Sequence, residues 1–172
     1  MKSVLIPILF ALVFPACLVW AAISDARSMT IPNRLTIGLA VAFLPVALLC
    51  HLSLAQFGLH VGLGFAGLAF GVALFAFKMM GGGDAKLIGA TCLWLGLHGA
   101  LAMLIYTALA GGVLTLGLLG ARKAPIAAVT GALPSWVNRH LDPKGDIPYG
   151  IAICVGGLLA IGQCDLLPLL GL

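Results

Sequence analysis

Charged residues are scarce in this sequence, and glutamate is missing altogether. Only 8% of the 172 residues are charged, whereas a soluble domain carries about 25%. The chain therefore cannot cover a water-facing surface, and its mean hydropathy of +1.19 argues against a soluble protein in the same way. The net charge of +4 is small and sits in short loops rather than on a basic patch, which argues against a nucleic-acid partner.

Paired cysteines are also lacking. No two cysteines have the CxxC spacing that is typical of structural zinc sites. We interpret them as small apolar residues inside membrane helices. His51, His60 and His98 are assigned to turns on the outer face, and we expect neither a metal nor a cofactor. The five cysteines are Cys17, Cys50, Cys92, Cys154 and Cys164.

The sequence contains four long runs without any charged residue. A membrane-spanning helix needs roughly 20 residues, so the first and last of four such runs each fit one span. As one helix the second run would be roughly 64 Å long, about twice the hydrocarbon thickness, and it must fold back near 51–60. The third run is expected to fold back near His98-Gly99. The runs hold 21, 43, 35 and 18 residues, at 4–24, 35–77, 87–121 and 147–164.

These runs predict an all-α, polytopic membrane protein with about six transmembrane helices. Val4–Ile23 is longer than the apolar run of a typical signal peptide, so we interpret it as a span. Eight of the nine Lys and Arg residues, all but Lys2, occur in three internal loops that six spans place on one face of the membrane. The positive-inside rule makes that face cytoplasmic. The third loop, Arg122–Asp146, is amphipathic, which is typical of a segment lying on the membrane surface. We expect one membrane-embedded domain over 1–172, with spans near 4–24, 35–51, 59–77, 86–98, 100–120 and 147–165.

Asp25 and Asp84 stand at the ends of two different spans. Asp25 directly follows the first span and Asp84 directly precedes the fourth, so both are expected at the cytoplasmic end, although 59 positions separate them. Carboxylates at the edge of the hydrocarbon are costly and therefore point to a function. The structural alternative is that each is a loop residue paired with a nearby base, Asp25 with Arg27 and Asp84 with Lys86.

Three consecutive glycines precede Asp84. Gly81-Gly82-Gly83 weaken any helix there and let another backbone, such as a substrate strand, approach closely. A flexible turn or close helix packing would explain the same residues. Two aspartates that share one proton can hydrolyse a peptide, because the ionised one takes a proton from water while the other donates to the scissile carbonyl. Such a site forms a tetrahedral diol and needs no metal or nucleotide.

Three short motifs resemble the type IV prepilin peptidase family, the GxGD aspartyl proteases of bacterial inner membranes. In that family one catalytic Asp precedes an Ile-Pro-Asn segment, and the other ends the GxGD motif. The resemblance therefore implies that Asp25 and Asp84 are the catalytic residues. The motifs are Asp25-Ala26-Arg27, Ile31-Pro32-Asn33 and Gly81-Gly82-Gly83-Asp84-Ala85-Lys86-Leu87.

The resemblance extends over nearly the whole chain. It implies a single peptidase domain that removes the basic leader from prepilin and pseudopilin precursors at the cytoplasmic face of the bacterial inner membrane. Bifunctional members carry a large insertion with CxxC motifs between the first two spans and also methylate the new N-terminus, whereas here that loop is only Ser24–Arg34. The chain resembles the compact form associated with Flp/Tad-type pili, and Pro148-Tyr149-Gly150 also looks like this branch. Peptidase activity without methyltransferase activity is therefore expected, and the oligomeric state stays open.

Five further residues are candidates for binding substrate or shaping the site. Gly81 and Gly83 belong to the glycine loop. Asn33 is expected to cap the second span, with Pro32 holding the entry extended and a role in positioning the aspartates as the second possibility. Lys86 either holds substrate or Asp84, or reaches to the membrane interface.

The remaining aspartates are expected to lie outside the site. Asp142 and Asp146 fall in a loop rich in Pro and Gly and are interpreted as turn residues. Asp165 falls at the outer end of the last span, too far in depth to join the pair.

Two other functions stay open. A small ion- or proton-coupled transporter could use Asp25 and Asp84 as relays, but it predicts carboxylates near the midplane. A structural subunit that packs through glycine faces would leave both aspartates dispensable.

Overall fold

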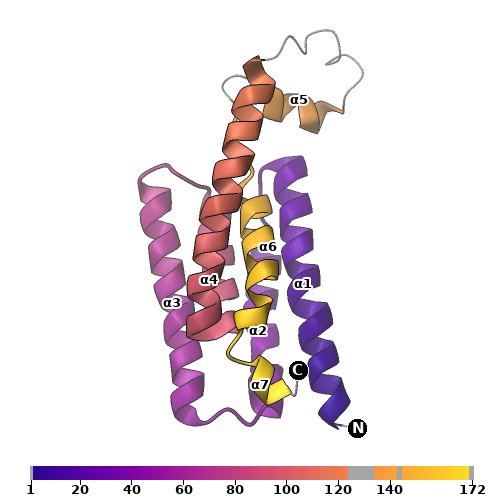
Figure 1. The fold of residues 1–172 in the computed structure, drawn as a ribbon, viewed down its shortest axis with the longest axis vertical. Coiled ribbons are helices and arrows are strands. Elements are labelled where there is room, and N and C mark those ends of the chain that lie inside the picture. The colour runs from indigo at the N-terminus through magenta and orange to yellow at the C-terminus, as the bar shows by residue number, and fades with distance from the viewer. Residues whose placement is uncertain (1, 124–133, 143–144, 171–172) are drawn as a thin grey trace.

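The computed structural model describes residues 2–123, 134–142 and 145–170. Within these residues every regular element is a helix, so the all-α membrane fold expected from the sequence is confirmed. Figure 1 shows a bundle of long helices that run alongside one another, with the short helix α5 lying across one end. The helices are α1 (Lys2–Ser28), α2 (Asn33–Leu49), α3 (Leu54–Ala76), α4 (Gly82–Lys123), α5 (Ser135–Leu141), α6 (Tyr149–Leu159), the 3-10 helix η3 (Ala160–Gln163) and α7 (Leu167–Leu170).

The outer surface of the bundle suits a bilayer. In the described part of the chain, α3 and α4 are each long and apolar enough to cross a membrane, and α2 and the α6–η3 pair are shorter apolar segments. Many large apolar side chains point outward, which a bilayer tolerates and water does not. Among the most exposed are Leu48, Phe65, Val113 and Leu116.

α4 consists of two antiparallel halves rather than one rod. The break is at Gly96, whose φ of 73° lies in the left-handed region that glycine adopts without strain. The Asp165 carboxylate accepts hydrogen bonds from the Leu97 N–H (2.6 Å) and from His98 Nδ1 (2.8 Å). The chain therefore folds back just before His98-Gly99, close to the predicted position. Gly96 supplies the left-handed φ of this turn, and the Asp165 carboxylate caps the second half of α4.

The turn between α2 and α3 is shorter than predicted. α2 ends at Leu49, and Ser53 already caps α3, because its side chain accepts from the Gln56 N–H while Gln56 Oε1 accepts from the Ser53 N–H. This reciprocal capping starts α3 at Leu54, five residues before the predicted span. His60 consequently lies inside α3, where Nδ1 donates to the Leu93 carbonyl at 2.8 Å, and the prediction that His60 belongs to a turn was wrong.

Aromatic rings fill the centre of the bundle around the first half of α4. Trp94 is fully buried, and its indole N–H donates to the Leu39 carbonyl of α2 at 2.8 Å. Phe10 and Phe14 of α1 and Phe43 of α2 surround it, with ring centroids 5.5 to 6.1 Å from the Trp94 ring. Because the indole N–H has a hydrogen-bond acceptor, this cluster connects three helices without leaving the buried N–H unpaired.

Glycines let α3 and the first half of α4 approach one another closely. A Cβ added at Gly71 would lie 2.6 Å from Ala85 Cα, and one added at Gly67 would lie 2.7 Å from Cys92 Sγ. This is the packing of small residues that brings membrane helices into contact. Ala85 follows Asp84 directly, so the contact fixes the start of α4 against α3.

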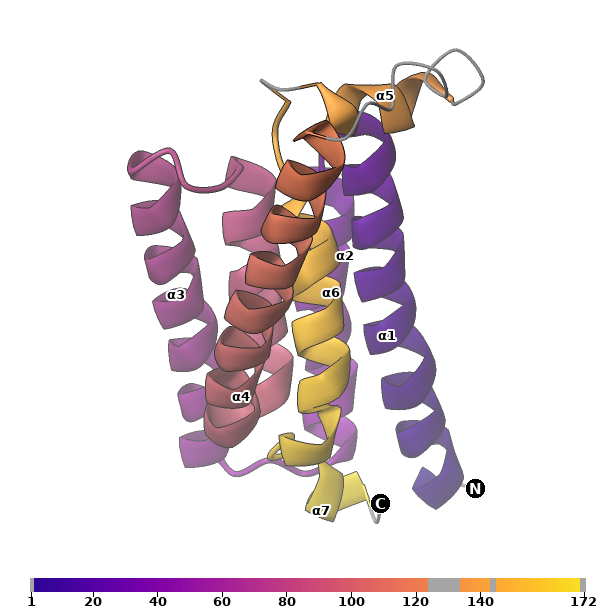
Figure 2. The same cartoon turned by 45° about the horizontal axis from the view of Figure 1, so that its top comes forward.

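One end of the bundle collects the features that the charge pattern assigned to the cytoplasm. The C-terminal end of α1, the loop between α3 and α4, the Lys123 end of α4 and helix α5 all lie there (Figures 1 and 2). The marked chain ends lie at the opposite end. Because α4 folds back at Gly96, its first and last turns return to the same end.

Candidate active site

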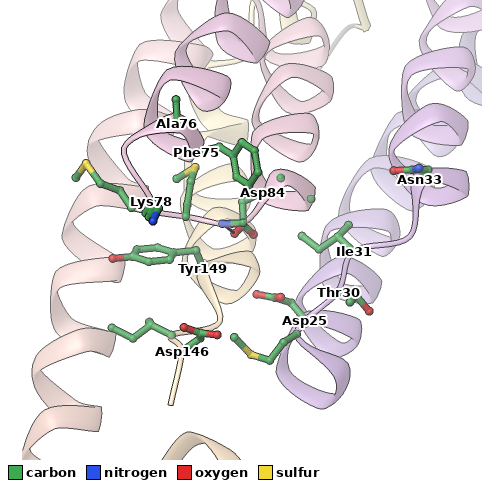
Figure 3. A pocket seen from close by; sticks show the side chains of 17 residues that line it. Asp25, Thr30, Ile31, Asn33, Phe75, Ala76, Lys78, Asp84, Asp146 and Tyr149 are labelled. Carbon is green, nitrogen blue, oxygen red and sulfur yellow. Dashed lines mark hydrogen bonds between the residues drawn. The ribbon is translucent and has the colours of Figure 1, made fainter. Parts of the chain in front are cut away.

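A cavity of about 800 Å³ opens at the end of the bundle where α1 ends and α4 begins. Its walls come from the end of α1, the segment that leads to α2, the end of α3 with the glycine loop, and the approach to α6 (Figure 3). Segments that are far apart in the sequence thus line one cavity.

Asp25 enters the cavity from the last turn of α1. The residue is 5% exposed, and its Oδ2 accepts a hydrogen bond from the Gly150 N–H at 2.8 Å. A Cβ added at Gly150 would lie 2.8 Å from Asp25 Cβ, so only glycine allows the α6 backbone to come this close. The first turn of α6 therefore fixes one oxygen of the Asp25 carboxyl group.

Asp84 enters from the first turn of α4. It is also 5% exposed, and its Oδ2 accepts from the Gly81 N–H at 2.9 Å. The free N–H groups of a helix start carry partial positive charge, so an acidic side chain suits this position. Its other oxygen, Oδ1, is buried and has no hydrogen-bond partner among the described residues.

The two carboxyl groups face one another across the cavity in Figure 3. Both line it. Two buried carboxyl groups at close range resist ionising together, so such a pair holds one shared proton. One member can then accept a proton while the other donates one.

The glycine loop shapes the cavity through contact rather than through unusual backbone angles. Gly81, Gly82 and Gly83 all line the cavity. A Cβ added at Gly83 would lie 3.0 Å from Ile31 Cβ and 3.3 Å from the Ile31 nitrogen. Gly83 needs no left-handed φ, so its requirement is the close approach to Ile31.

Comparison with known proteins assigns the chain to a family. A model of the type IV leader peptidase family matches residues 12–116, which are 105 of the 172 residues and include Asp25 and Asp84. The chain belongs to the type IV leader peptidase family. No curated protein and no solved structure matches it. The resemblance drawn from the short motifs is therefore confirmed at the level of the family.

The side chains of Asn33 and Lys86 form a hydrogen bond with each other. Lys86 Nζ donates to Asn33 Oδ1 at 2.8 Å, which ties the start of α2 to the first turn of α4. Asn33 lines the cavity but is not the cap of α2: Pro32 holds that position, and no side chain caps the helix. The predicted capping role of Asn33 was therefore wrong, because its amide oxygen is engaged by Lys86. The structure gives Lys86 this partner rather than Asp84.

Three residues of the site, all of which follow α5 in the chain, were not identified from the sequence. Gly150 binds Asp25, while Asp146 and Tyr149 line the cavity. The signal was present in Pro148-Tyr149-Gly150, because a glycine at a helix start often marks close approach of a backbone. All of these residues lie beyond the region matched by the family model.

Asp165 and Asp142 lie away from the aspartate pair. Asp165 binds His98 and the Leu97 N–H at the opposite end of the bundle, and Asp142 follows α5 directly. Neither lines the cavity. Asp146 does line it, so the prediction that Asp146 lies outside the site was wrong. Within the described ranges no group of three or more His, Cys, Asp or Glu residues could hold a metal ion.

Proposed function

We propose that this leader peptidase is an aspartic endopeptidase that cleaves the basic leader from Flp-type prepilins and pseudopilins at the cytoplasmic membrane face. Asp25 and Asp84 are the catalytic pair. The observation that carries the proposal is that these two carboxyl groups, 59 positions apart, are buried against one cavity at one end of the bundle.

The arrangement of the carboxyl groups suits activation of water. Each aspartate has one oxygen held by a backbone N–H, from Gly150 and Gly81 respectively. Asp84 Oδ1 stays available for the reaction. The ionised aspartate removes a proton from water, the hydroxide equivalent attacks the scissile carbonyl carbon, and the protonated aspartate donates to the carbonyl oxygen. The resulting diol collapses when the leaving amine takes up a proton, with no covalent intermediate.

The glycine loop supports the binding of an extended peptide. Gly81 and Gly82 line the cavity beside Asp84, so a substrate backbone meets little side-chain bulk there. The loop runs into the first turn of α4, which begins at Gly82, and N–H groups of such a turn suit the oxygens of a peptide. An extended segment advances about 3.3 Å per residue, so a few residues around the scissile bond fill this space.

The short connection between α1 and α2 supports a peptidase without methyltransferase activity. Only the residues between Ser28 and Asn33 separate the two helices. Family members with the second activity carry a large insertion there, and this connection is too short to form one. We therefore assign the chain to the compact form that serves Flp/Tad-type pili in the bacterial inner membrane.

Transport by the same two aspartates is less well supported. A proton or ion relay places carboxylates near the bilayer midplane along a polar path. Asp25 and Asp84 instead lie in the last turn of α1 and the first turn of α4, at one end of the bundle. The middle of the bundle is occupied by the aromatic cluster around Trp94.

The decisive experiment is cleavage of a pilin precursor by the purified protein in detergent. Asp25→Asn and Asp84→Asn keep the shape of each side chain and remove its charge and proton relay, so both variants are expected to lose cleavage. Asp142→Asn is the matched control and is expected to retain most activity, because Asp142 does not line the cavity. Robust cleavage by either pair variant would refute the catalytic role.

The proposed cytoplasmic placement has its own test. Single cysteines at Ser28, Gly82 and Ser135 are expected to react with an impermeant reagent only from the cytoplasmic side, and one at Gln56 only from outside. Labelling of the Gly82 position from the outer face would overturn the assigned orientation.

A further inference from the structure

Helix α5 contacts the end of α1 through a buried histidine. His140 is 7% exposed, and its Nε2 lies 2.6 Å from the carbonyl oxygen of Ala26. A carbonyl oxygen only accepts, so Nε2 carries the proton and donates. Trp136, one turn earlier in α5, packs against the imidazole ring with the two centroids 6.4 Å apart.

The bonded carbonyl is one that α1 cannot satisfy through its own helix. The last four C=O groups of a helix have no partner in regular continuation. The Asp25 carbonyl accepts from the Met29 N–H at 2.8 Å, and the next carbonyl, that of Ala26, receives the His140 proton. His140 thus closes the last turn of α1 at the residue directly after Asp25, where a histidine N–H is favourable.

Arg122 holds His140 in place from the other side. It lies in the last turn of α4, and its Nε donates to the His140 carbonyl at 2.8 Å while Nη2 donates to the Gly145 carbonyl at 2.7 Å. The planar guanidinium makes both bonds at once, which fixes direction as well as distance. The first turn of α4 therefore carries Asp84, and its last turn anchors α5 through Arg122.

We propose that His140 is a positioning residue that holds the Asp25 turn of α1 in register with Asp84, with Arg122 as its support; this rests on the proposed aspartic peptidase function. Gly150 fixes one oxygen of the Asp25 carboxyl group, and His140 fixes the backbone that carries it. Without the imidazole the last turn of α1 loses its hydrogen bond to α5, and the bond from the Gly150 N–H to the Asp25 carboxyl group remains.

The test compares His140→Phe with His140→Gln in a precursor-cleavage assay. Phe keeps a ring but cannot donate, whereas the Gln amide places an N–H close to the position of Nε2. His140→Phe is expected to lower kcat on the order of tenfold to a hundredfold, the effect of a misplaced catalytic group, while KM changes by less than about twofold. His140→Gln is expected to recover most of kcat. His98→Phe, at the opposite and exposed end, is the matched control.

A second measurement follows the contact without relying on cleavage. Amide hydrogen exchange over residues 26–30 is expected to be faster in His140→Phe than in the wild type and restored in His140→Gln. If His140→Phe does not fold, Arg122→Lys tests the same contact, because lysine keeps the charge and loses the two-bond geometry. It is expected to lower kcat with KM retained and to raise exchange over the same residues.

Each outcome decides the assignment. Unchanged kcat in His140→Phe, or equal losses of kcat in the Phe and Gln variants, would overturn the positioning role. Wild-type protein that leaves the precursor intact would overturn the proposed function and this role with it. An active wild type beside an equally active His140→Phe would overturn the positioning role alone, so the two failures are distinguishable.

Discussion

Substitution of Gly150 by alanine is the sharpest test of how the site is held. The added Cβ would lie 2.8 Å from Asp25 Cβ and 2.9 Å from Asp25 Oδ2. Ordinary contacts between carbon atoms are about 3.5–4.0 Å. Asp25 Cβ is attached directly to the α1 backbone, so the clash cannot be relieved by a change of rotamer alone.

The size of the effect follows from that overlap. Separating the two Cβ atoms to about 3.5 Å requires a shift of roughly 0.7 Å. This shift lengthens the bond from the Gly150 N–H to Asp25 and moves Asp25 relative to Asp84. Misplacement by about 1 Å costs on the order of a hundredfold in rate, so a fall in kcat of tenfold to a hundredfold is expected. Overpacking itself costs about 1–3 kcal/mol of stability.

The assay measures kcat for precursor cleavage together with the yield of folded protein in detergent. Gly112→Ala is the control, because nothing lies within 4 Å of a Cβ added there. That variant is expected to keep kcat and to gain as much as about 1 kcal/mol of helix stability. If Gly150→Ala cleaves at the wild-type rate, the start of α6 does not position Asp25, and the contact between α1 and α6 is irrelevant to catalysis.

Three further outcomes follow from the site and the fold. Gly83→Val is expected to reduce turnover sharply with little loss of folded protein, because its Cβ would press on Ile31 in the cavity wall; normal turnover would mean that the loop is only a hinge. Asp165→Ala is expected to lower the free energy of unfolding by about 1–2 kcal/mol, as the loss of a helix cap does, with kcat unchanged; an unchanged melting temperature in detergent would contradict the capping role. Cleavage is expected to fall at both acidic and alkaline pH, since the pair works only with one proton; a rate that stays level into acid would argue against the shared proton.

Charge and hydropathy alone predicted much of the framework. The runs without charge predicted apolar helices, and the basic loops placed Asp25 and Asp84 at one end of the bundle, where α1 ends and α4 begins. The exact fold-backs were not accessible in this way. The turn at Gly96 depends on Asp165, 69 positions later, and the early start of α3 depends on side-chain capping by Ser53.

The contacts that hold the catalytic candidates were beyond a reading of local sequence. Gly150 reaches Asp25 across 125 positions, and His140 reaches Ala26 across 114. Such contacts leave no periodicity or spacing in the chain, because they arise only when α4 folds back and brings α5 and α6 beside α1. Asn33 illustrates the opposite error. Its place at a helix start fits a cap, but Lys86 offers its oxygen a charged donor.

The volume of the cavity has a kinetic consequence. Water occupies about 30 Å³ per molecule in the liquid, so a space of about 800 Å³ has room for on the order of 25 molecules. Under the proposed function, this cavity gives water access to the carboxyl groups even at the edge of a bilayer. Under the proposed function the peptide is the reactant that must be ordered, and it loses about 1–2 kcal/mol of backbone entropy for each residue fixed. For the precursors that we propose as substrates, discrimination is then expected to depend on how readily the segment around the scissile bond becomes extended.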